Sequence, residues 1–247
     1  MNMLRKNNLK DKVVILTGAS GGIGQVIAKA LATRNMRLML VGRNTNKLAQ
    51  LAERVRAIGG EAAICKADLQ DNKAVKIILN ATLEAFGGID VLINNAGRAQ
   101  NTAFEDVTVE EFDRIFTLNT KAPYFLTQKA LPYLLKSDFA TVINIASIVA
   151  HKGYVQQSAY AGSKSALLGW SKSLAAEYYK KNIRVHVISP GGVYTEMVAL
   201  ARPDLTPDEM IQPEIIADTI LFLLDHRDTN AVIDEIGIHR ANKEPFL

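Results

Sequence analysis

The chain has 247 residues, of which 48% are hydrophobic and 22% are charged, a balance that excludes an intrinsically disordered protein. Its net charge of +4 comes from Lys and Arg residues interleaved with acids, which argues against a nucleic-acid partner and is compatible with a small anionic ligand. The single cysteine, Cys65, excludes an internal disulfide and a cysteine-based zinc site. No apolar stretch approaches the roughly 20 residues that span a bilayer. We therefore expect a cytoplasmic protein with no metal, membrane or nucleic-acid partner.

A tail is the first element predicted in chain order, over residues 1–10. The densest basic stretch of the chain begins there, and its members are Arg5, Lys6, Lys10 and Lys12. They lie among asparagines and without an aromatic platform, so the pattern favours a solvated tail over a nucleic-acid surface.

From residue 12 onward, short apolar runs alternate with longer helical patterns, which is typical of βα units that feed a parallel sheet buried on both faces. Strands are predicted at 13–17, 37–41, 61–66, 91–94, 141–146, 184–188 and 231–236. Helices are predicted at 22–35, 45–58, 73–86, 109–136, 158–181 and 213–224. The fourth helix is expected to bend near Pro123, because proline lacks an N–H. We predict one α/β domain over residues 1–247 with a doubly wound sheet.

A glycine-rich turn follows the first predicted strand and opens the first predicted helix. It reads Thr-Gly-Ala-Ser-Gly-Gly-Ile-Gly over residues 17–24, in the context that a dinucleotide site requires. Gly18, Gly22 and Gly24 would allow a sharp turn, close approach of a pyrophosphate to the backbone, and tight packing of helix on strand. The alternative is an ordinary tight connection in an α/β sheet.

Tyr160 and Lys164 are four positions apart in a predicted helix, so that they share one face. A nearby ammonium favours a phenolate, and we therefore expect Lys164 to lower the pKa of Tyr160 toward the range where proton transfer is efficient. This spacing alone is weakly specific. Ser147, on the loop after the fifth predicted strand, could donate a hydrogen bond to a reacting oxygen as negative charge develops there.

Six segments, in order along the chain, resemble motifs of the short-chain dehydrogenase/reductase family, including its 3-oxoacyl-acyl-carrier-protein reductase-like members. They are residues 17–24, the Asn-Asn-Ala-Gly of 94–97, Asn119, Ser147, the Tyr160–Lys164 pair and the Pro-Gly-Gly-Val-Tyr-Thr of 190–195. The resemblance covers nearly all of residues 10–237. It implies a single-domain Rossmann fold whose seven strands, mainly parallel, follow the order 3-2-1-4-5-6-7, and a homodimer or homotetramer. It also implies hydride transfer between a nicotinamide and a carbonyl or alcohol carbon of a small molecule.

The resemblance further implies a role for each site residue. Tyr160 would be the general acid/base, Ser147 would orient the substrate, Lys164 would hold the nicotinamide ribose, and Asn119 would bend its helix and anchor a water that leads to the lysine. The residues implied in cofactor binding are Gly18, Ser20, Gly22, Ile23, Gly24, Arg43, Asp68, Asn95, Ala96, Gly97, Tyr160, Lys164, Pro190, Gly191, Val193 and Thr195. A substrate lid is expected over about residues 195–213.

Arg43 indicates which nicotinamide cofactor is preferred. The second predicted strand ends in Val-Gly-Arg, without the acid that would bind the ribose 2′-hydroxyl of NAD(H), so the sequence favours NADP(H). A solvated loop cation is the alternative, and Gly21 stands where NADP-preferring members often carry a second basic residue. Asp68 resembles the adenine-contacting aspartate of the family and could equally cap the next helix.

A catalytically silent dinucleotide-binding sensor or scaffold of the same fold is the alternative to an enzyme. The complete set of Asn119, Ser147, Tyr160 and Lys164 argues against it. Residues 232–240 lack the paired glycines that are common in ketoacyl-carrier-protein reductases, which leaves membership of that subgroup open. The identity of the substrate does not follow from these motifs.

Overall fold

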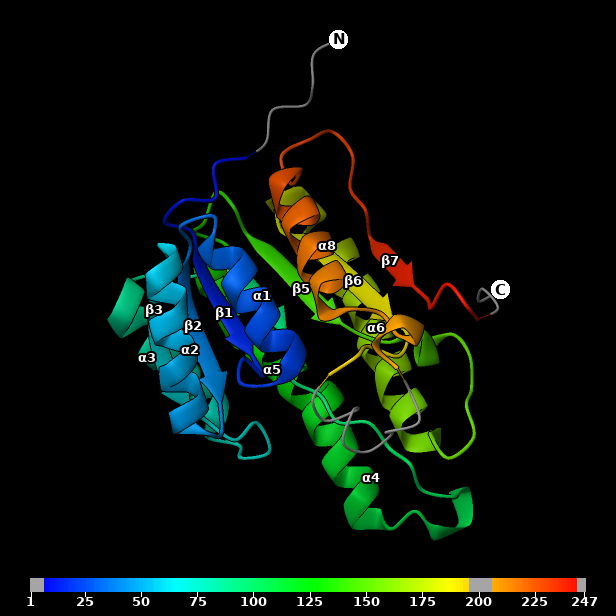
Figure 1. Ribbon diagram of the computed structural model, residues 1–247. Coiled ribbons are helices and arrows are strands. Elements are labelled where there is room, and N and C mark those ends of the chain that lie inside the picture. Colours follow the sequence, from blue (N-terminus) through cyan, green and yellow to red (C-terminus); the bar gives the residue numbers. More distant parts are fainter. Residues whose placement is uncertain (1–6, 196–205, 244–247) are drawn as a thin grey trace.

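Seven strands form one parallel sheet in the computed structural model, which describes residues 7–195 and 206–243 (Figure 1). The strands are β1 (Val13–Thr17), β2 (Arg37–Gly42), β3 (Glu61–Lys66), β4 (Val91–Asn94), β5 (Thr141–Ile145), β6 (Arg184–Pro190) and β7 (Glu235–Ile238). Their order is β3-β2-β1-β4-β5-β6-β7, and every neighbouring pair is parallel. The predicted fold class and strand order are confirmed.

Helices cover both faces of this sheet (Figure 1). One face carries α1 (Gly22–Ala32), α2 (Thr45–Ile58) and α8 (Pro213–Asp225), and the other carries α3 (Ala74–Phe86), α5 (Ala122–Leu134) and α6 (Ser158–Tyr178). Because both faces are covered, all residues of β1, β4 and β5 are buried, which explains why most of them are apolar. Within the described ranges, no helix is both long and apolar enough to cross a membrane.

The sheet brings distant segments together at one edge. In a parallel sheet the carboxyl ends of all strands lie on the same side, and the order of this sheet reverses at β1, which pairs with both β2 and β4. Ligands bind in the crevice at such a switch point. The glycine-rich turn, Asn95 and Gly191 directly follow a strand and Ser147 lies two residues after one, so all of them lie at this edge.

The helix predicted at 109–136 consists of two helices. Here α4 (Val109–Phe116) ends in a π-helical turn at Thr117–Lys121, and α5 then begins. The predicted position of the bend, near Pro123, was wrong by about one turn. Proline lacks the N–H that would bond the carbonyl of Asn119 in an α-helix, so the ring disturbs the helix four residues before itself.

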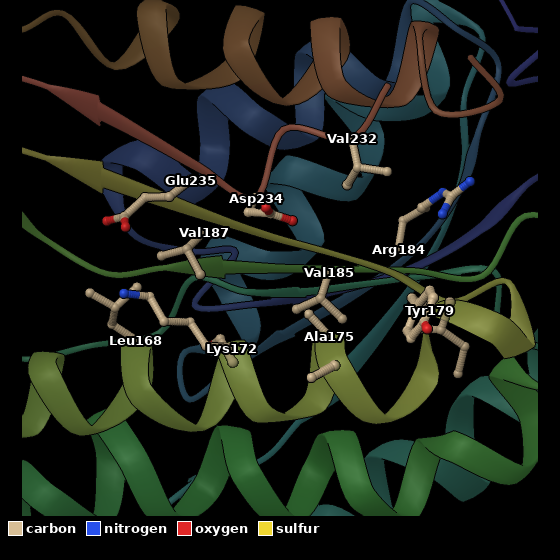
Figure 2. Close-up of a pocket in the computed structure, with 13 residues that line it drawn as sticks. Leu168, Lys172, Ala175, Tyr179, Arg184, Val185, Val187, Val232, Asp234 and Glu235 are labelled. Carbon is tan, nitrogen blue, oxygen red and sulfur yellow. The ribbon is translucent and has the colours of Figure 1, made fainter. Parts of the chain in front are cut away.

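The last strand was predicted at 231–236 and begins instead at Glu235. The carbonyl of Ile233 accepts a hydrogen bond from Nδ1 of His186 at 2.7 Å, so a side chain takes the place of a strand partner. Regular pairing with β6 starts at Val187, opposite Glu235. A groove of about 520 Å³ remains between this segment, β6 and α6, and Val232 and Asp234 lie on its wall (Figure 2).

Part of the predicted N-terminal tail packs against the fold. Residues 1–6 and the lid residues 196–205 lie outside the described residues. Asn7 donates its backbone N–H to the carbonyl of Asp225 at 2.9 Å, and Leu9 is only 2% exposed. The prediction of a solvated tail is wrong for residues 7–9, because burial of the apolar Leu9 draws this stretch onto the core.

Candidate functional site

Three glycines of the turn between β1 and α1 lie where no side chain fits. Gly18 has a φ of 66°, and a Cβ on it would lie 2.9 Å from the Cα of Ala96. A Cβ on Gly22 would lie 2.9 Å from the Cβ of Thr195, and one on Gly24 would lie 2.2 Å from the carbonyl oxygen of Gly18. The first N–H groups of a helix lack intrahelical acceptors and carry partial positive charge. The turn therefore fits the pyrophosphate of a dinucleotide.

Asn95 fixes the glycine-rich turn to the end of β4. Its side-chain nitrogen donates to the carbonyls of Thr17 at 3.0 Å and Gly18 at 3.3 Å. The hydroxyl oxygen of Thr17 in turn accepts the backbone N–H groups of Asn95 at 3.0 Å and Ala96 at 3.1 Å. Asn94 links the next two elements instead, since its amide donates to Thr127 and Asn144. These asparagines hold the two loops in one geometry.

A cavity of about 330 Å³, the glycine-turn cavity, opens beside this turn. Eleven of the residues predicted to bind the cofactor line it, namely Gly18, Ser20, Gly22, Ile23, Gly24, Arg43, Asp68, Asn95, Ala96, Gly97 and Thr195. Pro190 and Val193 are not on its wall: the carbonyl of Pro190 accepts from the Ser147 hydroxyl at 3.2 Å, and Val193 forms a β-bridge with Ile211.

Arg43 and Asp68 stand at the mouth of the glycine-turn cavity. Nη1 of Arg43 lies 3.9 Å from Oδ2 of Asp68, and the Arg43 side chain is 73% exposed. Oδ1 of Asp68 accepts the backbone N–H of Gln70 at 3.0 Å, which stabilises a turn. Asp68 does not cap α3, whose N-cap is Lys73. The Arg43 guanidinium is therefore exposed to solvent, at the edge of ion-pair distance from Asp68.

A second cavity, of about 980 Å³, contains Ser147 and Tyr160, and we call it the tyrosine cavity. Ser147 lies two residues after the end of β5, and its hydroxyl caps a short 3-10 turn, Ile148–Ala150, by accepting from the N–H of Val149 at 3.4 Å. Tyr160 lies in the first turn of α6 and lines the same cavity as Ser147. Gly191, a predicted cofactor residue, also lines this cavity. The predicted serine and tyrosine are therefore brought together.

Lys164 and Asn119 meet at Gly97, which borders the glycine-turn cavity. A Cβ on Gly97 would lie 3.3 Å from both Nζ of Lys164 and Oδ1 of Asn119. Nζ of Lys164 donates to the carbonyl of Ile145 at 2.7 Å. Asn119 bonds both backbone groups of Arg98, at 2.8 and 2.9 Å, through its side-chain amide. Lys164 is only 4% exposed, and Gly97 alone separates its Nζ from the wall of the glycine-turn cavity.

The charge state of the tyrosine–lysine pair differs from the prediction. Burial raises the pKa of the Tyr160 phenol, and its hydrogen bond with Ser147 offsets part of that rise. Burial also lowers the pKa of Lys164 to about 8. The expected lowering of the Tyr160 pKa by Lys164 is wrong here, because Nζ lies 6.0 Å from the ring centroid and is directed to Ile145. Desolvation dominates over attraction at this distance. Tyr160 therefore keeps its proton at neutral pH.

Comparison with known proteins agrees with this geometry. The family model of the short chain dehydrogenases matches residues 12–206. The chain belongs to the short-chain dehydrogenase family. A relative, the ketoacyl reductase HetN of a Nostoc species, is 30% identical over 231 residues, which cover 92% of this chain and 80% of HetN.

Two solved structures that are similar to this chain differ in the cofactor that their names give. The angucycline C-6 ketoreductase LanV with bound NADP has a TM-score of 0.85 at 28% identity, covering 96% of this chain and 97% of LanV. The NADH-dependent reductase A1-R′, responsible for alginate metabolism, has a TM-score of 0.84 at 27% identity, covering 96% and 99%. As a short-chain dehydrogenase, this protein is an oxidoreductase that binds a nicotinamide cofactor and transfers hydride to or from a small molecule.

Gln100 holds the start of α6, and the sequence motifs did not reveal it. Its Oε1 accepts the backbone N–H groups of Ala159 at 2.9 Å and Tyr160 at 3.2 Å, and the side chain is buried. The residue at the N-cap position, Gln157, makes no side-chain cap. No local pattern marks Gln100, because the residues that it caps lie 59 and 60 positions away.

Replacing Gln100 by Leu is expected to lower both the stability of the short-chain dehydrogenase and its turnover. The loss of two accepted hydrogen bonds at a helix N-terminus should reduce the free energy of unfolding by about 1–2 kcal/mol. Urea unfolding and kcat measure the two effects. Gln100→Glu is the matched control, since a carboxylate still accepts both N–H groups; an unchanged Gln100→Leu variant would show that the cap is dispensable.

Proposed function

We propose that this short-chain dehydrogenase interconverts a carbonyl and an alcohol with NADP(H), and that Tyr160 is its general acid/base. The observation that carries the proposal is that Ser147 and Tyr160 line one cavity, the tyrosine cavity, with Nζ of Lys164 close to Gly97. The dinucleotide, when bound along the glycine-rich turn, supplies or accepts the hydride. The protein supplies the proton and the orientation of the substrate.

In the reducing direction, Tyr160 gives its phenolic proton to the carbonyl oxygen of the substrate. Its raised pKa keeps that proton available at neutral pH. Ser147 has one hydroxyl proton, which it donates to the carbonyl of Pro190 at 3.2 Å in the structure. To hold the substrate oxygen, this hydroxyl rotates from Pro190 toward the tyrosine cavity, where it stabilises the developing negative charge.

Lys164 and Asn119 have positioning roles in the proposed reaction. An ammonium has three donors, and Lys164 gives one of them to the carbonyl of Ile145, which leaves two for ribose hydroxyls and for a water. The Asn119 amide is held by Arg98 and donates to the Ser163 hydroxyl at 3.0 Å, so it joins the end of β4 to α6. The π-helical turn at this asparagine supports its role as a bend in the helix.

The preference for NADP(H) is part of the proposal. Arg43 is exposed at the mouth of the glycine-turn cavity, where it would pair with a 2′-phosphate. The nearby Asp68 moderates this attraction, since its carboxylate lies 3.9 Å from the guanidinium. The NADP complex of LanV supports the assignment by likeness.

We also infer that the chain forms a homodimer or homotetramer. Phe112 of α4 and Tyr124 and Phe125 of α5 are large apolar or aromatic side chains that are 42–44% exposed. Exposed groups of this kind are typical of protein contacts. Light scattering, which measures mass in solution, tests this assembly against the monomer mass of 27.0 kDa.

The test of the proposed reaction is a panel of ketones, aldehydes, sugars and acyl thioesters, each assayed with NADPH and NADH. We expect oxidation of NADPH that depends on the carbonyl compound, and slower oxidation of NADH. Tight NADPH binding without turnover of any compound would instead favour the sensor or scaffold.

A further inference from the structure

Every Lys, Arg, Asp or Glu side chain that lines the tyrosine cavity in the described ranges is cationic. Lys152, Arg240 and Lys243 are these residues, and no described Asp or Glu lies on the wall. Within the described part of the chain, none of the three forms an ion pair or donates a side-chain hydrogen bond to the protein. Their positive charge is therefore available to a bound molecule.

These three cations lie on two separate segments of the chain. Lys152 lies just beyond the turn that Ser147 caps, and the N–H of Lys152 donates to the carbonyl of Ile148 at 3.2 Å. Arg240 and Lys243 follow β7, and the N–H of Lys243 donates to the carbonyl of Arg240 at 3.1 Å. The two segments are far apart in the sequence, and the fold brings both to the same cavity.

The side chain of Arg240 lies over Gly192, in the 190–195 segment. A Cβ on Gly192 would lie 3.9 Å from both Cδ and Nε of Arg240, so the side chain of the arginine passes over this residue. The segment is held there because the N–H of Gly191 donates to the carbonyl of Ile238 at 2.7 Å. Arg240 therefore lines the same cavity as Gly191 and Tyr160.

One carboxylate faces these cations from outside the cavity. Glu209 lies close enough to Arg240 and Lys243 that they contribute to lowering its pKa. Its Oε2 is already bonded by the N–H and the hydroxyl of Thr206, at 3.0 and 3.1 Å. Among the described residues that line the cavity, the three cations outnumber this one neighbouring carboxylate.

A buried donor on the same wall is also without a partner. Nε2 of Gln100 is buried and has no hydrogen-bond partner, although Gln100 lines the tyrosine cavity. The orientation of this amide is fixed, because its oxygen accepts the N–H groups of Ala159 and Tyr160. A buried unpaired donor is costly, so a bound oxygen is the group that would satisfy it.

We propose that Lys152, Arg240 and Lys243 bind an anionic group, a carboxylate or a phosphate, on a substrate whose carbonyl reacts beside Tyr160. This inference rests on the proposed function and adds the substrate class. Lys and Arg are pure donors, and their hydrogen bonds to anionic oxygens are shorter and stronger than those to neutral acceptors. The substrate is therefore an oxo acid or an oxo phosphate, and the alcohol formed from it keeps the charge.

The experiment compares matched charged and neutral probes. Levulinate and its methyl ester differ by one carboxylate charge, and dihydroxyacetone phosphate and dihydroxyacetone differ by a phosphate. We expect kcat/KM with NADPH to favour the charged member of at least one pair by about 10-fold, as one hydrogen-bonded charge contact would give. Which pair shows the preference distinguishes a carboxylate from a phosphate. In the double variant Arg240→Gln with Lys243→Gln, this ratio should fall to about 1.

The matched control removes two lysine charges elsewhere. Lys76 on α3 and Lys129 on α5 are exposed and line neither cavity, so Lys76→Gln with Lys129→Gln should leave the ratio unchanged. Equal kcat/KM for charged and neutral probes, or a ratio that the control lowers as much, overturns the inference.

Calorimetric binding of the same probes to the NADP-saturated protein separates the two proposals. If an anion binds through Arg240 and Lys243 but no probe is reduced, the anion site stands and the proposed reaction fails. If the neutral probes are reduced as well as the anions, the reaction stands and the anion site fails. If neither anion binds more tightly than its neutral counterpart and neither is reduced, the anion site is rejected.

Discussion

Replacing Tyr160 by Phe is expected to lower kcat by about 10²–10⁴-fold, because a positioned general acid contributes that much to proton transfer. The ring of Phe keeps the packing of α6 and removes one hydroxyl. Binding of NADPH should change little, since the glycine-rich turn and Arg43 line a different cavity. Initial rates of NADPH oxidation and calorimetric binding of NADPH measure the two quantities.

Tyr179→Phe is the matched control for this result. Tyr179 is 58% exposed and lies beyond the end of α6, so removal of its hydroxyl should leave kcat unchanged. A Tyr160→Phe variant with normal turnover would remove the tyrosine from the mechanism. A variant that lost NADPH binding as well would show that the hydroxyl organises the cofactor site.

Replacing Arg43 by Asp is expected to reverse the cofactor preference. The new carboxylate would accept the 2′-hydroxyl of NADH and repel the 2′-phosphate of NADPH. Asp68 lies 3.9 Å from the present guanidinium and would add to the repulsion. The ratio of kcat/KM with NADPH to kcat/KM with NADH should fall by about 100-fold, the size expected for reversal of a close charge contact.

Arg54→Asp provides the same change of charge on the exposed face of α2. It should leave the ratio between the two cofactors nearly unchanged, because Arg54 does not line the glycine-turn cavity. If Arg43→Asp also leaves the ratio unchanged, Arg43 is a solvated loop cation and another group selects the cofactor.

The parts of the site that depend on local spacing could be predicted from the sequence. The glycine-rich turn follows a strand within a few residues, and the Tyr160–Lys164 pair lies one helical turn apart, so each is visible in a short window. The sheet order was predictable because the resemblance covers most of the chain. In contrast, Gln100 acts on residues 59 and 60 positions away, and no window contains both partners.

The predictions that were wrong have two physical causes. One is desolvation by the whole fold, and the other is the loss or replacement of backbone hydrogen bonds. The Tyr160–Lys164 spacing indicated attraction, but the sign of the Tyr160 pKa shift depends on desolvation by the whole fold. The bend near Pro123 was displaced because the missing N–H acts at Asn119. The start of β7 was displaced because His186, a side chain on the neighbouring strand, bonds the carbonyl of Ile233.

The segment after β7 has an evolutionary consequence. Arg240 and Lys243 lie outside the sheet, in a stretch joined to the catalytic edge mainly through the bond between Gly191 and Ile238. Ser147 follows β5 and Tyr160 lies on α6, so substitutions after β7 leave the elements that hold this pair unchanged. If the proposed anion site is correct, evolution can change substrate preference through Arg240 and Lys243 without altering the elements that hold Ser147 and Tyr160.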